Sequence, residues 1–164
     1  MGSNASVQFL SIVIPTYNES RSIQETLTTL MPFIQAGHEV IVVDGGSEDE
    51  TVSLCKLYTD KIFVEKKSRS SQMNFGAKQA SNEILVFLHA DTVLPSNAAS
   101  LIANALSGSS KQWGHFKVKL KGEKFILRII EFFMNKRSCI TGIVTGDQTI
   151  FIEKKLFELA NGYK

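Results

Sequence analysis

Charged side chains recur in this sequence beside short apolar runs that predict buried strands. Glu19, Asp44 and Asp91 each come shortly after such a run, and Arg69 lies in a serine-rich basic stretch. A carboxylate at a strand end can hold Mg²⁺ or Mn²⁺, hard ions that favour oxygen ligands and are often completed by substrate phosphates. Such an ion would neutralise a departing diphosphate. Tyr17 adds an aromatic wall for a base, so the set suits a nucleotide diphosphate.

Each of these side chains also has a plainer interpretation. Asp91 could cap the following turn, and His89 could be a packed histidine rather than a second metal ligand. Asp44 could be a loop carboxylate beside a helix N-terminus. Arg69 could be solvated, and Tyr17 could pack in the core. The signals are weak singly, and their placement at successive strand ends is what makes the joint case.

The elements that must position these residues alternate along the first hundred residues. Apolar runs rich in β-branched residues predict buried strands over residues 9–14, 40–43, 62–64 and 84–88. Helices are expected between them, two opening with capping boxes at residues 22–25 and 47–50. This alternation predicts an α/β fold with a mostly parallel sheet and helices on both faces. Ligands bind beyond the carboxyl ends of such strands, so the four polar clusters should converge on one crevice.

The rhythm changes after residue 110. Alternation over residues 114–120 predicts an edge or half-exposed strand, and a dense apolar run predicts a helix over residues 125–134. One more strand is expected over residues 149–152, followed by a last helix over residues 154–160.

Length and composition exclude several classes of protein. The chain has 164 residues and a net charge of +2, which favours one domain and gives no basic surface for nucleic acid. We expect residues 1–5 to be an expression remnant and residues 6–164 to form a single domain. Two distant cysteines indicate a reducing, cytoplasmic compartment without a zinc site. No run of eighteen apolar residues predicts a membrane span.

Two other enzyme classes with similar architecture fit the sequence poorly. A dinucleotide-dependent oxidoreductase needs G-x-G-x-x-G after the first strand, where this chain has P-T-Y-N-E at residues 15–19. A sugar nucleotidyltransferase would need a glycine-rich basic loop there, which is also absent.

Five segments together resemble the family 2 glycosyltransferases over residues 10–163. Residues 14–19 look like the family's opening P-x-Y-N-E, and residues 43–51 look like its V-D-D-G-S-x-D-x-T. The other three segments match one bacterial-type subgroup. Residues 69–76 match its R-x-x-Q-M-N-x-G, residues 87–92 its F-L-H-A-D-T, and residues 141–148 its T-G-x-x-x-G-D-Q. Together these motifs are highly specific.

The resemblance implies the GT-A nucleotide-diphospho-sugar fold and inverting transfer from a nucleotide-diphosphate sugar, with UDP favoured. By it, Asp44 would read the base with help from Arg69, and Asp91, with His89 as a second candidate, would hold Mg²⁺ or Mn²⁺. The base and ribose would be lined by Pro15, Thr16, Tyr17 and Glu19. The sugar or acceptor would lie near Gly146, Asp147 and Gln148.

Departures from the family pattern mark where the resemblance is weakest. The second aspartate of D-D-G-S is Gly45 here, and the usual D-x-D metal pair is His89-Ala90-Asp91. The family's general base follows a Gly-Phe or Gly-Tyr pair; here that pair is Gly162-Tyr163, and Lys164 ends the sequence. We therefore expect a C-terminal truncation, with Asp147 as a substitute base. The alternative is a non-catalytic module that binds nucleotide sugars.

The acceptor could be a lipid, a saccharide or a small metabolite. The helix predicted over residues 125–134 is apolar on more than one side. It could pack beneath the acceptor site, form a dimer surface, or lie in a membrane interface to meet a lipid-linked acceptor. The last interpretation would place the protein at the inner membrane surface.

Overall fold

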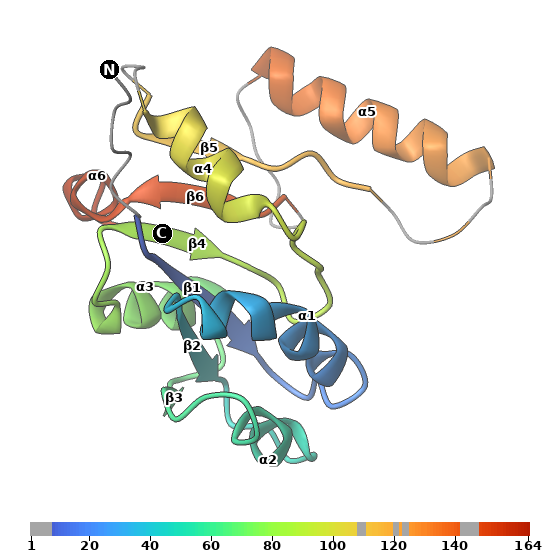
Figure 1. Ribbon diagram of the computed structural model, residues 1–164. Coiled ribbons are helices and arrows are strands. Elements are labelled where there is room, and N and C mark those ends of the chain that lie inside the picture. Colours follow the sequence, from blue (N-terminus) through green and yellow to red (C-terminus); the bar gives the residue numbers. More distant parts are fainter. Residues whose placement is uncertain (1–7, 108–110, 120–121, 123–124, 142–147) are drawn as a thin grey trace.

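The computed structural model describes residues 8–107, 111–119, 122, 125–141 and 148–164. The remnant expected at residues 1–5 lies outside this part of the chain. Strands and helices alternate as the sequence predicts (Figure 1). The strands are β1 Leu10–Thr16, β2 Glu39–Asp44, β3 Ile62–Val64, β4 Ile84–Phe87, β5 Trp113–His115 and β6 Ile150–Glu153. The helices are α1 Ile23–Gln35, α2 Thr51–Cys55, α3 Arg69–Gln79, α4 Ala98–Leu106, α5 Phe125–Thr141 and α6 Lys154–Leu159.

The strands form one six-stranded sheet in the order β3-β2-β1-β4-β6-β5. β1 pairs in parallel with β2 and β4, and β2 pairs in parallel with β3. β6 is antiparallel to both β4 and β5. The mostly parallel sheet is confirmed, and the strand expected at an edge is the edge strand β5.

Two apolar layers cover the two faces of the sheet. On one face, Ile12, Ile14 and Val86 pack with residues of α1 and α4, including Leu27 and Ile102. On the other face, α3 and α6 cover β1, β2 and β4 through residues such as Met73 and Phe157. Burial on both faces explains why these strands read as continuous apolar runs rather than as an alternation. Helices on both faces are thereby confirmed.

Both predicted capping boxes are wrong. The side chain of Ser22 makes no cap hydrogen bond to α1 and donates instead to the Glu19 carboxylate at 2.9 Å. α2 begins only at Thr51, and the hydroxyl of Ser47 donates to Asp44 at 2.5 Å. In both cases the serine hydroxyl is hydrogen-bonded to a nearby carboxylate instead of to the helix backbone.

Three further boundaries differ from the prediction. α3 begins at Arg69, capped by Ser68, so Arg69 lies in the first helical turn rather than in a loop. The strand predicted over residues 114–120 is limited to β5, and the helix predicted over residues 125–134 extends to Thr141. Gly37, at φ +90°, follows the end of α1.

Candidate functional site

Asp44 organises the turn at the carboxyl end of β2. It is 1% exposed, and its carboxylate accepts a hydrogen bond from the Thr16 hydroxyl of β1 at 3.0 Å. It also accepts the backbone N–H groups of Gly46 at 2.9 Å and Ser47 at 2.7 Å, in addition to the Ser47 hydroxyl. A carboxylate has about four lone-pair sites, so these four donors nearly fill it. The geometry therefore favours the role of a loop-organising carboxylate for Asp44.

Hydrogen bonds connect the loop after β1 with the loop after β2, and they come from residues of the P-x-Y-N-E and V-D-D-G-S-x-D-x-T segments. Asn18, in the left-handed conformation at φ 53°, accepts a hydrogen bond from the Glu48 N–H at 2.9 Å. Its own N–H donates to the hydroxyl of Ser47 at 2.8 Å. The N–H of Glu19 donates to the Thr51 hydroxyl at 2.8 Å. These motif side chains thus fix the shape of the strand-end loops.

Gln72 of α3 connects the ends of the same two strands. Its side-chain amide is buried and donates to the carbonyl of Thr16 at 2.7 Å and to that of Val43 at 2.8 Å. Gly45 lies against this amide, because a Cβ built there would be 3.3 Å from Gln72 Nε2. Gly45, the position that departs from the family pattern, therefore has little space for a larger side chain.

A cavity of about 260 Å³ opens where the loop after β1 faces the start of α3. Its lining includes Arg69 and the four residues predicted to contact the base and ribose, which are Pro15, Thr16, Tyr17 and Glu19. The ammonium of Lys67 lies 3.6 Å from the centroid of the Tyr17 ring. Tyr17 is half-buried at this wall, so its packing in the core is not observed. Motif reasoning did not assign Lys67, Ser68 or Gln72 to this site; for Lys67, its place in the basic stretch before α3 was the available signal.

Asp91 lines a different cavity of about 550 Å³. The opposite wall is the segment after β5, where Lys117 and Lys119 are exposed, and Thr149 completes it. Asp91 is exposed, and one carboxylate oxygen accepts a hydrogen bond from Thr92 Oγ1 at 3.3 Å. The structure thus shows two cavities where the sequence predicts one crevice.

The remaining predicted site residues are placed less directly. His89 is buried, with 8% exposure, and Gln148 is buried at the start of the segment leading to β6. Gly146 and Asp147 lie outside the described residues. Within the part of the chain that the structure describes, no three histidine, cysteine, aspartate or glutamate side chains cluster to hold a metal. A lone exposed carboxylate fits a Mg²⁺-type ion only when substrate phosphates complete its coordination.

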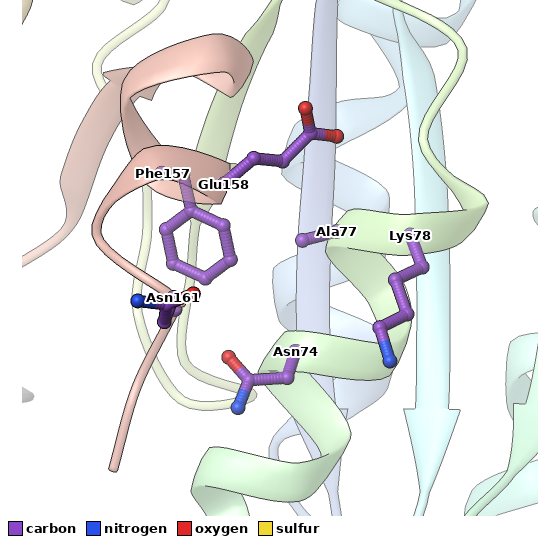
Figure 2. A pocket seen from close by; sticks show the side chains of 7 residues that line it. Asn74, Ala77, Lys78, Phe157, Glu158 and Asn161 are labelled. Carbon is purple, nitrogen blue, oxygen red and sulfur yellow. The ribbon is translucent and has the colours of Figure 1, made fainter.

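A third cavity, of about 310 Å³, lies between α3 and α6 (Figure 2). Phe157 and Asn161 face Asn74, Ala77 and Lys78 across it. None of its lining residues is a predicted site residue. Asn74, the asparagine of the R-x-x-Q-M-N-x-G motif, donates to the Tyr163 carbonyl and accepts the Tyr163 N–H, both at 2.9 Å. Its motif position is therefore explained by holding the Gly162-Tyr163 segment onto α3.

Cys55 is a buried free thiol. It is fully buried in the core, and burial together with the charge of Asp44 raises its pKa to about 12. A thiol with so high a pKa carries almost no thiolate at neutral pH and is a poor nucleophile or metal ligand.

Comparisons with known proteins identify the family and the fold. The sequence model of glycosyl transferase family 2 matches residues 11–153. The poly-beta-1,6-N-acetyl-D-glucosamine synthase of Staphylococcus epidermidis is 33% identical over 98 residues. That alignment covers 56% of this chain and 24% of the synthase, so the matched part spans about a quarter of that relative.

Solved structures share the fold. The mannosyltransferase PcManGT from Pyrobaculum calidifontis, in complex with GDP-Man and Mn²⁺, matches with a TM-score of 0.71 at 22% identity, over 96% of this chain and 48% of its own. S. aureus TarS 1-349, in complex with UDP-GlcNAc, matches with a TM-score of 0.69 at 21% identity, over 93% of this chain and 47% of its own. At these identities the likeness establishes the fold, which is the GT-A fold.

Proposed function

Since the chain belongs to glycosyl transferase family 2, we propose that it transfers a sugar from a nucleotide-diphosphate sugar to an acceptor hydroxyl with inversion. UDP is the favoured nucleotide. The observation that carries the proposal is the cavity at the end of β1, where Tyr17 offers an aromatic wall beside Lys67 and Arg69. An aromatic face and two cations are the groups that a base and a diphosphate require.

The donor's base and ribose lie against Pro15, Thr16, Tyr17 and Glu19 in this proposal. Arg69 at the N-terminus of α3 faces the diphosphate, because a helix N-terminus also favours an anion. Asp44 contacts the base, or holds the loop that does so through its hydrogen bonds to Gly46 and Ser47.

Asp91 would hold Mg²⁺ or Mn²⁺ at the diphosphate, and His89 is a second candidate ligand. PcManGT, a neighbour in fold, binds Mn²⁺ with its donor. The ion would supply positive charge for the leaving diphosphate. The single exposed carboxylate of Asp91 suits an ion that takes its other ligands from the substrate.

In the transfer step, the acceptor oxygen forms a bond to the anomeric carbon of the sugar. The bond from that carbon to the phosphate oxygen breaks, and the nucleoside diphosphate leaves with the electron pair. The acceptor proton passes to a general base, for which Asp147 is the candidate within this sequence. Gln148 lies beside the sugar or acceptor. We place the reaction in the cytoplasm, with a lipid-linked, saccharide or small-metabolite acceptor.

Nucleotide release from the donor tests this function. The chain is incubated with UDP-GlcNAc, UDP-Glc or GDP-Man, with Mn²⁺ or Mg²⁺, and the free nucleoside diphosphate is measured. We expect slow release to water from one donor. Asp91→Asn should abolish it, and Asp60→Asn, an exposed aspartate at the opposite ends of the strands, should leave it unchanged. If the chain binds the nucleotide sugar but releases no nucleoside diphosphate, it is a non-catalytic binding module and not an enzyme.

A further inference from the structure

α5 presents its apolar side to solvent. In Figure 1 this helix lies clear of the sheet and of the other helices. Phe125, Phe132 and Phe133 are 78%, 59% and 64% exposed. Ile126, Ile129 and Ile130 are exposed as well, and the spacing of these residues places them on one broad helical face. Single exposed apolar side chains are ordinary, but a contiguous patch of this kind marks an interaction surface.

The side of α5 turned toward the rest of the molecule is largely polar. Asn135 accepts the Val118 N–H at 2.9 Å and donates to the Val118 carbonyl at 3.0 Å. Arg128 donates to the carbonyl of Gly122 at 3.0 Å and pairs with Glu131 at 3.1 Å. A helix that packs on the core of its own domain turns its apolar side inward, whereas α5 turns its polar side inward. The outward apolar face is therefore available to a partner.

Exposed lysines lie on this outward face and on a neighbouring segment. Lys136 lies within the outward face, 5.5 Å from the centroid of the Phe132 ring. Lys117 and Lys119 are exposed on the segment that Asn135 holds. Glu131, the one acidic residue in the sequence of α5, pairs with Arg128 on the inward side. Two copies of this face would bring like charges together, whereas an anionic surface complements it.

We propose that α5 docks on an anionic membrane surface, with its axis along the bilayer and its apolar face in the headgroup region. An amphipathic helix with basic residues beside an aromatic and aliphatic face binds lipid in this way. Among the described residues, no helix is long and apolar enough to cross a bilayer. Docking would also bring the Asp91 cavity close to the membrane, because Val118 lines that cavity and is held by Asn135.

Co-flotation of the chain with lipid vesicles tests the docking and requires no donor, so it is independent of the proposed transfer. We expect binding to vesicles of phosphatidylcholine with phosphatidylglycerol, and weak binding to phosphatidylcholine alone. High salt should weaken the binding, since it shortens the screening length. Phe132→Ser with Phe133→Ser should lower the partition coefficient by about tenfold per residue. Lys117→Ser with Lys119→Ser should lower it by about fivefold per residue.

The matched control removes exposed leucines elsewhere on the surface. Leu57 and Leu159 are 71% and 80% exposed, and Leu57→Ser with Leu159→Ser should leave flotation unchanged. Circular dichroism melts check that each variant is folded. The proposal is overturned if folded chain does not float with anionic vesicles. It is also overturned if the phenylalanine variant floats like the unaltered chain, or if light scattering shows a dimer that uses this face and binds no lipid.

Discussion

At the scale of single residues, the family motifs consist largely of side chains that hold loops in place. Asp44, Asn18 and Thr51 bond to other parts of the two strand-end loops. Gln72 and Asn74 of α3 bond to backbone groups at the strand ends and at Tyr163. Motif spacing located the loops from the sequence, but it could not separate a residue that contacts substrate from one that shapes the loop. That distinction depends on which donors and acceptors the fold brings together.

Gln72→Leu should destabilise the chain and weaken nucleotide binding together. The substitution removes two hydrogen bonds to buried carbonyls, that of Val43 and that of Thr16, which keeps the Gly45 N–H as a donor. At about 0.5–1.5 kcal/mol per hydrogen bond, the cost is about 1–3 kcal/mol. For a domain of this size that is a fall of roughly 2–10 °C in Tm, which a thermal melt measures.

The control for this prediction lies on the same helix. Gln79 is exposed, so Gln79→Leu should change neither Tm nor nucleotide affinity. Equal effects of the two substitutions would contradict the role given to the Gln72 amide.

At the scale of elements, close packing of α3 on the sheet explains the glycine of the same motif. A Cβ at Gly76 would lie 2.3 Å from Val13 Cγ1 of β1 and 3.1 Å from Val43 Cγ2 of β2. Gly76→Ala should therefore cost about 1–3 kcal/mol by overpacking, measured by urea unfolding.

A second substitution can relieve the same contact. Val13→Ala removes the methyl groups nearest the new Cβ, so it should cost less in the Gly76→Ala chain than in the unaltered chain. Simple additivity of the two changes in unfolding free energy would show that this contact is not the cause.

The elements themselves were largely predictable from sequence, and their ends were not. Continuous apolar runs identified the strands because both sheet faces are covered. Ser22 and Ser47 carry the sequence signal of helix caps, yet their hydroxyls bond to Glu19 and Asp44. Those carboxylates are close in the chain, so sequence alone offers two partners for each serine. Only the turn geometry decides between them.

At the scale of the whole molecule, Glu39 at the start of β2 connects several segments at the end of the sheet opposite the site. Burial alone would raise the pKa of Glu39, but hydrogen bonds lower it from 4.5 to about 2; the donors are Lys61, Ser11 and Ser81. A lowered pKa gives stability that is present above pH 4.5 and lost as the pH falls toward about 2.

Glu39→Gln should thus lower Tm at neutral pH and flatten its acid dependence. Melts across the acid range should show the two chains converging near pH 2, where the native carboxyl is protonating. Parallel curves over the whole range would mean that other groups dominate the acid response.

The arrangement of the whole molecule also limits what sequence could reveal about the site. β4, which precedes Asp91, is the parallel neighbour of β1, yet Asp91 lines a different cavity from the one at the end of β1. The loops that follow the two strands, and not the strand order, therefore decide which cavity each side chain lines. The motifs in the sequence do not show how the two cavities lie relative to each other.

We propose that a nucleoside diphosphate binds at these strand ends with a metal held by Asp91. The most direct measurement is a thermal melt with UDP or GDP, each with Mn²⁺, Mg²⁺ or a chelator. A ligand at about 100 times its Kd should add about 2.7 kcal/mol, a rise of roughly 5–10 °C. We expect that rise with one nucleotide and metal, and its loss in Asp91→Ala. No rise with either nucleotide, or a rise that is the same in Asp91→Ala, would contradict the proposal.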